Sequence, residues 1–316
     1  MRANIFIDGA AGTTGLEIRE RLTARRDLTV VQMSDSDRKD LKARARALND
    51  ADLVILCLPD DAAREAVSLI KNPDVRVIDA STAHRVSPGW VFGFPEYEPG
   101  NYDAIASSKR VTNPGCYSTG FLAVVRPLVR AGVIPIDAPL TVNAVSGYSG
   151  GGKSMIEEFE KRDSPNYVKS VVRTYALNLA HKHVPEMKER AGLTHAPVFA
   201  PSVGRYYRGM IVEVPLQLWS LPGAPPAGSI HALLCDAYRD RNFVEVAAMH
   251  EADAIKTLDA EMLINTNKLK IYVFTNEKTQ QVRLVAVLDN LGKGASGAAV
   301  QNLNIMLGLS ETTGLA

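Results

Sequence analysis

The chain has 316 residues, with 36 Lys and Arg against 35 Asp and Glu, and a net charge of +1. This length suggests two domains, and the 46% of hydrophobic residues suffice for a core in each. The balanced charge gives no support for binding to nucleic acid or to a membrane surface, so we expect a small molecule as the partner.

Cellular location is indicated by what the sequence lacks. No apolar run reaches the roughly 18 residues of a membrane span, and the N-terminus has no apolar stretch of the kind found in secretory signals. The three cysteines, Cys57, Cys116 and Cys235, are too few and too far apart for a disulfide framework. These features predict a cytoplasmic protein with neither a membrane nor a nucleic-acid partner.

The first 81 residues alternate between apolar strands and amphipathic helices. Strands are expected near residues 3–8, 28–34, 52–59 and 75–81, with helices at 16–26, 41–49 and 60–70 between them. Continuous apolar strands separated by helices predict a Rossmann-type parallel sheet that is covered on both faces.

The rest of the chain has a different pattern. Residues 82–101 suggest a loop, and the helix predicted from Cys116 should be kinked or broken by Pro127. After Gly132, longer and often alternating strands surround helices at 153–162 and 229–240, which predicts an α+β domain with a large mixed, mostly antiparallel sheet. An apolar helix is expected at 297–309.

A glycine-rich turn follows the first strand. Gly9, Gly12 and Gly15 are spaced GxxGxxG, with Thr13 and Thr14 between the last two. Glycines at a strand-to-helix turn let backbone N–H groups approach a phosphate, and the helix N-terminus favours its charge. An ordinary tight turn is the alternative, but the strand-turn-helix context favours a dinucleotide site.

The end of the second strand bears on which dinucleotide is bound. Ser34 stands near the position where NAD-specific proteins carry an acidic residue, and Arg38 and Lys39 follow it. A hydroxyl and cations suit a 2′-phosphate, so NADP(H) is the predicted cofactor. Asp35 is the competing feature, because it would suit NAD.

The segment NPGCYSTG places Cys116 directly after a Pro-Gly turn and at the start of a helical pattern. A helix N-terminus stabilises a thiolate, and N–H groups of the same turn can form an oxyanion hole. We therefore predict that Cys116 is a nucleophile rather than a small buried residue. Cys57 and Cys235 lie in apolar surroundings and are expected in the core.

A catalytic cysteine usually works with a histidine. In the segment HKHVPE, Glu186 follows His183 by three residues and is placed to orient its ring, and Pro185 suits a first helical turn. A metal pair at His181 and His183 is the alternative, but a third ligand is not evident and no metal is predicted. His84 is expected near the cofactor, and the remaining histidines, His195, His231 and His250, at the surface.

Taken together, these motifs resemble the N-acetyl-γ-glutamyl-phosphate reductase family, in its shorter form, over nearly the whole chain. The segments that carry the resemblance are GAAGTTG, NPGCYSTG, SGYSGGGK, HKHVPEM and DNLGKGASGAAVQN. The resemblance implies a dinucleotide-binding domain at 1–115, completed by the C-terminal helix in 292–316. It implies a catalytic, substrate-binding and oligomerisation domain at 116–291, in a homodimer or homotetramer.

The resemblance also assigns residues. Cys116 becomes the nucleophile, and the histidines supply the base, with His183 preferred to His181 because of Glu186. Ser81 and Asn290 are assigned to the cofactor. Asn113, Ser146, Gly147 and Arg208 are assigned to the substrate, while the unusual segment 201–207 leaves Arg205 and the exact phosphate ligands undecided.

The implied reaction is the NADPH-dependent reduction of N-acetyl-γ-glutamyl phosphate to the semialdehyde through a thioester on Cys116, a step of arginine biosynthesis. Alternatives are the same chemistry on β-aspartyl phosphate or a carrier-bound analogue, and a non-catalytic NADP sensor. A sensor needs neither the cysteine at a helix start nor the histidine pair.

Overall fold

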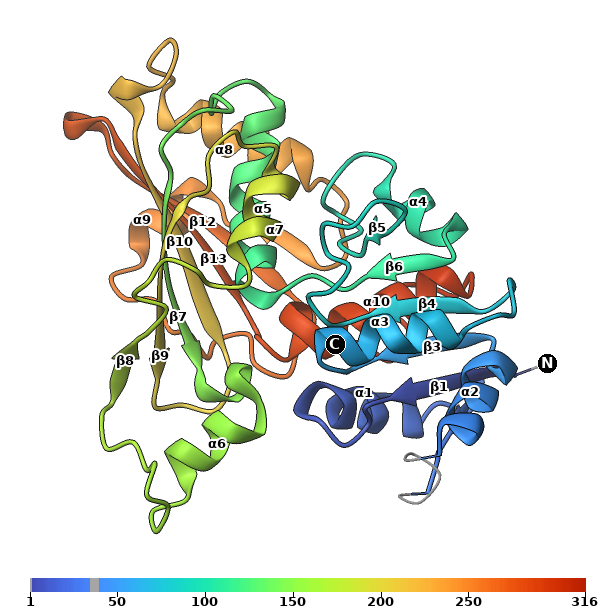
Figure 1. Cartoon of the computed structure of the whole chain (residues 1–316). Helices are drawn as coiled ribbons and strands as arrows, with labels where there is room; N and C mark the ends of the chain where they lie inside the picture. The colour runs from blue at the N-terminus through green and yellow to red at the C-terminus, as the bar shows by residue number, and fades with distance from the viewer. Residues whose placement is uncertain (1, 35–39) are drawn as a thin grey trace. The chain divides into compact units, whose positions relative to one another are not determined.

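The computed structural model describes residues 2–34 and 40–316, which form two compact units (Figure 1). The first unit comprises Met1–Pro95, Pro99–Gly115 and Ala295–Ala316. The second comprises Glu96–Glu98 and Cys116–Gly294. Each unit contains its own β-sheet.

The first unit is built on a six-stranded sheet with the order β2-β1-β3-β4-β6-β5. All neighbouring strands in it are parallel, which confirms the predicted Rossmann-type sheet. The strands are β1 (Ala3–Asp8), β2 (Leu28–Val31), β3 (Leu53–Leu56), β4 (Arg76–Asp79), β5 (Val91–Phe92) and β6 (Arg110–Thr112). The last two lie in a stretch from which no strand was expected.

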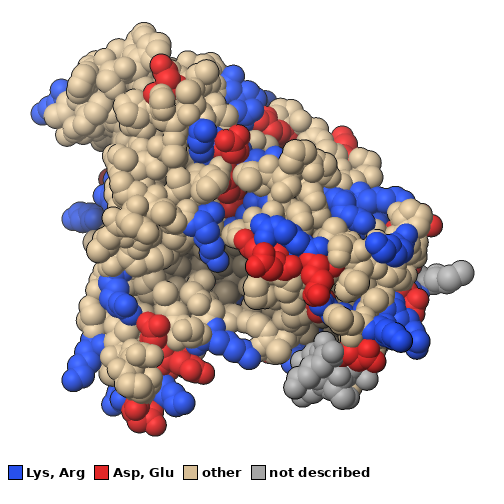
Figure 2. Space-filling view, viewed as in Figure 1, with Lys and Arg blue, Asp and Glu red and all other residues tan. Residues whose placement is uncertain are grey.

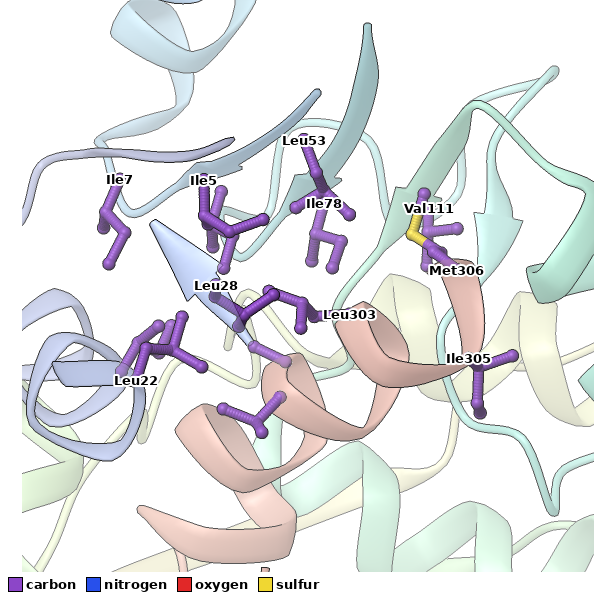
Figure 3. Packing of buried hydrophobic residues seen from close by; sticks show 14 of the residues in the cluster. Ile5, Ile7, Leu22, Leu28, Leu53, Ile78, Val111, Leu303, Ile305 and Met306 are labelled. Carbon is purple, nitrogen blue, oxygen red and sulfur yellow. The ribbon is translucent and has the colours of Figure 1, made fainter. Parts of the chain in front are cut away.

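Helices cover both faces of this sheet, as its continuous apolar strands require. They are α1 (Thr13–Thr23), α2 (Leu41–Asp50), α3 (Asp60–Leu69), α4 (Asn101–Ser107) and α10 (Gly297–Met306). Figure 3 shows Leu303 and Met306 of α10 in the same apolar cluster as Ile5, Ile78 and Val111 of the sheet. The C-terminal helix therefore completes the first unit, as expected.

The second unit contains a seven-stranded sheet with the order β11-β12-β13-β10-β7-β9-β8. Its β7–β9 and β11–β12 pairs are parallel and its other pairs are antiparallel, which confirms a mixed, mostly antiparallel sheet. The strands are β7 (Thr141–Gly147), β8 (Val172–Thr174), β9 (Val198–Gly204), β10 (Met210–Gln217), β11 (Val244–Val246), β12 (Leu269–Asn276) and β13 (Gln281–Leu288).

The helices of the second unit are α5 (Cys116–Arg130), α6 (Gly152–Glu160), α7 (Val184–Ala191), α8 (Ala227–Ala237) and α9 (Met249–Ala254). Short helical turns occur at η2 (Tyr148–Gly151), η3 (Leu218–Ser220), η4 (Glu277–Thr279) and η5 (Gly292–Ser296). Among the described residues, no helix is long and apolar enough to cross a membrane. On the face shown in Figure 2, basic and acidic side chains are interspersed, as the balanced composition suggests.

Helix α5 corrects one expectation, because Pro127 does not break it and the helix continues to Arg130. Proline has no N–H, so the carbonyl of Ala123, four residues earlier, loses its helical donor. The buried hydroxyl of Tyr238 donates a hydrogen bond of 2.8 Å to this carbonyl. A long-range side chain thus satisfies the group that Pro127 leaves without a helical partner.

Removing this hydroxyl should destabilise the second unit. Tyr238→Phe would leave a buried carbonyl without a donor, at a cost of about 1–3 kcal/mol in the free energy of unfolding. Tyr206→Phe is the matched control, because its buried hydroxyl has no hydrogen-bond partner among the described residues. Urea unfolding of both variants is the measurement, and equal losses would contradict this role for Tyr238.

Candidate active site

The glycine-rich turn of the first unit has the geometry that the sequence predicts. Gly9 has a φ of +88°, and a Cβ there would lie 2.2 Å from the carbonyl oxygen of Cys57. A Cβ on Gly15 would lie 2.5 Å from the carbonyl oxygen of Gly9. Both positions therefore need glycine so that the turn packs tightly against β3 and α1.

The start of α1 has features that fit the phosphates of a dinucleotide. Gly12 is the N-cap residue and offers no side-chain cap to the free N–H groups of the helix. The buried Oγ1 of Thr13 has no hydrogen-bond partner among the described residues. A Cβ on Gly12 would meet no atom of the chain closer than 3.5 Å, so the protein's own packing leaves room for a ligand here.

A small pocket lies at the carboxyl ends of β1 and β2, next to this turn. Its lining includes Asp8, Gly9, Met33 and the side chain of Arg19. Ser34 is exposed in the loop that follows β2, while Arg38 lies outside the described residues. Arg19 is a cation that sequence reasoning missed, and its place in the lining of this pocket reveals it.

A polar cluster follows β4 in the same unit. The buried carboxylate of Asp79 accepts hydrogen bonds from the backbone and hydroxyl of Ser81 and lies 2.5 Å from Nδ1 of His84. The His84 ring stacks on Trp90, with ring centroids 4.2 Å apart. The hydroxyl of Ser81 thus shapes the turn after β4.

In the second unit, Cys116 is the first residue of α5 and is half-buried. The turn η5 passes so close that a Cβ on Gly294 would lie 2.7 Å from Cβ of Cys116. The neighbouring Lys293 is fully buried and forms an ion pair of 2.8 Å with Glu96. This buried pair holds the glycine turn that contacts the cysteine.

The surroundings of the other two cysteines do not favour a thiolate. Burial raises the pKa of the Cys57 thiol to about 12, and the charges of Asp79 and Asp8 act in the same direction. Burial also raises the pKa of Cys235. Of the three thiols, Cys116 alone stands at a helix N-terminus, where a thiolate is stabilised.

A chain of polar side chains lies beside Cys116. The hydroxyl of Tyr175 donates to that of Tyr117 over 3.1 Å, and Nε2 of His181 lies 3.5 Å from the Tyr175 hydroxyl. Burial raises the pKa of Tyr175 to about 12, and a charge on Cys116 contributes to this rise. The thiol and the phenol are therefore within electrostatic reach of each other.

The hydrogen bonds of His181 assign its tautomer. The backbone N–H of His183 donates to Nδ1 of His181 over 3.1 Å. The neutral ring therefore carries its proton on Nε2, the atom that faces Tyr175. In this state His181 offers a donor to its surroundings.

His183 and Glu186 are more deeply buried than His181. His183 is 5% exposed and is the N-cap residue of α7, where Pro185 stands in the first turn as predicted. Glu186 is 1% exposed; burial lowers the pKa of Arg190 one turn later, and the charges of Tyr97 and Glu186 partly oppose this shift. His181, which is half-buried, is the more accessible of the two rings.

A second network joins three loops near η5. The side-chain carbonyl of Asn290 accepts from the backbone of Gly209, and its amide donates to the hydroxyl of Ser149. Arg208 forms an ion pair of 3.1 Å with the buried Asp289 and donates to Asn265. The charge of Arg208 is thus shared with an internal carboxylate.

The remaining predicted substrate residues have structural contacts. The hydroxyl of Ser146 donates to the carbonyl of Gly147, and a Cβ on Gly147 would lie 2.6 Å from the Tyr207 carbonyl oxygen. In the first unit, the side chain of Asn113 donates to Ala295 and accepts from Asn302. Arg205, which the sequence left undecided, donates to backbone carbonyls of Phe159 and Val168.

The part of the chain that the structure describes holds no group of three His, Cys, Asp or Glu side chains arranged to bind a metal. The second unit does hold the thiol of Cys116 at a helix N-terminus, with the phenol of Tyr175 and the imidazole donor of His181 beside it. Such a set can form a covalent acyl intermediate and stabilise charge on its oxygen.

Fold and site together define the semialdehyde dehydrogenase class. Residues 4–105 match the family model described as semialdehyde dehydrogenase, NAD binding domain, and residues 116–290 match semialdehyde dehydrogenase, dimerisation domain. The aspartate semialdehyde dehydrogenase II of Vibrio cholerae has a similar fold, with a TM-score of 0.71 at 16% identity over 97% of this chain and 98% of that one. A probable aspartate-semialdehyde dehydrogenase from Pseudomonas aeruginosa gives 0.73 at 14% identity, covering 97% and 99%.

Relatives of higher sequence identity identify the family within this class. N-acetyl-γ-glutamyl-phosphate reductase from Trichormus variabilis is 50% identical over 99% of both chains. The enzyme of that name from Brucella ovis is 51% identical over 98% of this chain and 100% of its own. The chain belongs to the N-acetyl-γ-glutamyl-phosphate reductase family, which confirms the resemblance drawn from its motifs.

Proposed function

We propose that this chain reduces N-acetyl-γ-glutamyl phosphate to N-acetylglutamate 5-semialdehyde, as the names of its relatives indicate, and serves arginine biosynthesis. The observation that carries the chemistry is Cys116 at the first position of α5, beside the Tyr175–His181 pair. Membership of the family supports the choice of substrate, whereas the fold alone is shared with enzymes that act on aspartate semialdehyde.

The reaction begins at Cys116. Its thiolate attacks the acyl carbon, a C–S bond forms, and the carbon–oxygen bond to phosphate breaks, so that phosphate leaves with the electron pair. NADPH, when bound, supplies the hydride that reduces the resulting thioester. Nε2–H of His181 donates to the substrate oxygen while it carries negative charge. Cleavage of the C–S bond then returns the electron pair to sulfur and releases the aldehyde.

We prefer His181 to His183 as the catalytic histidine for two reasons. Its Nε2 lies 3.5 Å from the hydroxyl of Tyr175, which donates to Tyr117, the residue next to Cys116, and its Nδ1 is fixed by a backbone N–H. His183 and Glu186 are assigned structural roles, because both side chains are buried and the His183 ring packs on Tyr117.

The cofactor is assigned to residues of the first unit, with Asn290 of the second unit as a further candidate. Gly9, Gly12 and Gly15 with the hydroxyl of Thr13 would hold the pyrophosphate, and Thr14 continues the same helix turn. Arg19 joins Ser34 and Arg38 as a candidate ligand of the 2′-phosphate that distinguishes NADP from NAD. Ser81 shapes the turn that follows β4, and Asn290 is kept as a candidate for the nicotinamide end.

Removing the charge of Arg19 tests this cofactor assignment. Arg19→Gln should raise KM for NADPH about tenfold, because a hydrogen bond to a charged group contributes about 1.5–3 kcal/mol, and should leave KM for NADH nearly unchanged. Arg46→Gln, which removes an exposed charge of α2 outside the pocket, is the control. Equal changes in both KM values for Arg19→Gln would remove Arg19 from the site.

A homo-oligomer is supported by the match to a dimerisation domain. A homodimer or homotetramer and a cytoplasmic location stay predictions.

The substrate is tested by running the reaction in reverse. Phosphate-dependent reduction of NADP⁺ is measured with N-acetylglutamate semialdehyde and with aspartate semialdehyde at matched concentrations. We expect kcat/KM to be at least a hundredfold higher for the acetylated substrate. A preference for aspartate semialdehyde would replace the proposed substrate, and no turnover with either, together with NADPH binding, would favour a sensor.

A further inference from the structure

A cavity of about 350 Å³ lies in the second unit, bounded by α8, β11 and the start of β12. None of the residues that line it belongs to the polar chain around Cys116. Its volume falls within the range of about 300–1,000 Å³ that is usual for small-molecule sites. The cavity therefore has room for a metabolite-sized ligand.

The walls of the cavity combine apolar and cationic groups. Val246 and Leu263 are half-buried and offer apolar surface to the cavity, whereas Phe243, Val244 and Leu269 are at most 4% exposed and offer almost none. Three cations, Arg241, Lys268 and Lys270, line the cavity together with one carboxylate, Glu245. The chemistry is thus amphipathic, with an excess of positive charge.

The pairing of these charges decides what they can bind. Lys270 is neutralised by Glu245 and Glu251, at 2.9 and 2.7 Å. Neither Arg241 nor Lys268 has an ion-pair partner in residues 2–34 and 40–316. Two exposed cations without an internal ion-pair partner therefore line the cavity.

One wall of the cavity carries a thiol whose surroundings differ from the sequence expectation. His231 was expected at the surface without a companion, but it is half-buried, and its Nε2 donates to the carbonyl of Ala247 over 2.8 Å. Its Nδ1 lies 3.7 Å from Sγ of Cys235. Cys235 was expected in the core, but it is half-buried and lines the cavity. Burial raises the pKa of Cys235, and because the thiol lines the cavity, its alkylation reports on whether the cavity is occupied.

We propose that this cavity binds a small organic anion, with carboxylate groups held by Arg241 and Lys268 and an apolar body against Val246 and Leu263. A cationic ligand would be repelled by these two positive charges, whereas a carboxylate gains charge-assisted hydrogen bonds that a neutral apolar ligand cannot make. A carboxylate matches the guanidinium of Arg241 in a two-point geometry, which gives the site selectivity for planar anions.

The test uses adipate as the probe and adipamide, its neutral isostere, as the control ligand. Iodoacetamide alkylation of the full-length protein is followed at the Cys235 peptide by mass spectrometry. We expect saturating adipate to slow alkylation of Cys235 at least threefold, whereas adipamide should not. Iodoacetamide is uncharged, so a bound anion protects the thiol by occupying space and not by repelling the reagent.

Variants identify the groups responsible. Arg241→Gln with Lys268→Gln should abolish protection by adipate, while Lys256→Gln, which removes an exposed charge outside the cavity, should retain it. Ligand-observed NMR of adipate compares the same variants without alkylation. The proposal can therefore be tested even if Cys235 reacts slowly with iodoacetamide. Equal effects of adipate and adipamide, or adipate binding that survives the double substitution, would overturn it.

Discussion

Replacing Cys116 with serine is expected to abolish turnover while leaving a folded protein. The two side chains have nearly the same volume, so the second unit should unfold at nearly the same urea concentration. Serine is a far weaker acid, and the stabilisation of about 1 kcal/mol that a helix N-terminus provides cannot produce an alkoxide at neutral pH. Without an acyl-enzyme, kcat should fall by about three orders of magnitude or more.

Two measurements separate this outcome from a structural effect. NADPH binding, followed by its fluorescence, should be unchanged in Cys116→Ser, because the glycine turn lies in the first unit. Cys235→Ser is the matched control and should keep its turnover. If Cys116→Ser kept near-normal turnover with unchanged stability, Cys116 would have to be a core thiol.

His181 offers a substitution with a similarly large effect and an internal control. An asparagine can still accept the His183 N–H in place of Nδ1 but has no group at the position of Nε2. A glutamine places an amide donor near the Nε2 position. Loss of one donor to a charged oxygen costs about 10²–10³ in kcat, so we expect such a loss for His181→Asn and a partial recovery for His181→Gln.

The same series tests the choice between the two histidines. His183→Asn removes a buried ring that packs on Tyr117 and His181, and should mainly lower the free energy of unfolding. A larger loss of kcat for His183→Asn than for His181→Asn, at equal stability, would return the catalytic role to His183.

The sequence predicts the architecture well where the pattern is long and local. Strands such as β10 and β13, with eight residues each, show alternation that identifies them. The strands β5, β6, β8 and β11 have only two or three residues and carry too little pattern to be recognised. Their extended conformation depends on neighbouring strands rather than on their own composition.

The site could be predicted only in part for a similar reason. Cys116 and the histidine pair stand in compact motifs, so the sequence identifies them. Tyr175 stands in no motif, and its link to Tyr117 joins residues 58 positions apart. The continuation of α5 past Pro127 depends on Tyr238, which lies 115 positions from the carbonyl it satisfies. Contacts of this kind follow from the folded sheet and cannot be read from local spacing.

The covalent step at Cys116 is the central claim, and the mass of the enzyme tests it most directly. The protein is mixed with N-acetyl-γ-glutamyl phosphate without NADPH, quenched in acid, and measured intact and as peptides. We expect one N-acetylglutamyl group per chain on the Cys116 peptide, its removal when NADPH is added before the quench, and none on Cys116→Ser. An active enzyme that carries no acyl group under these conditions, or carries it on another residue, would contradict the account.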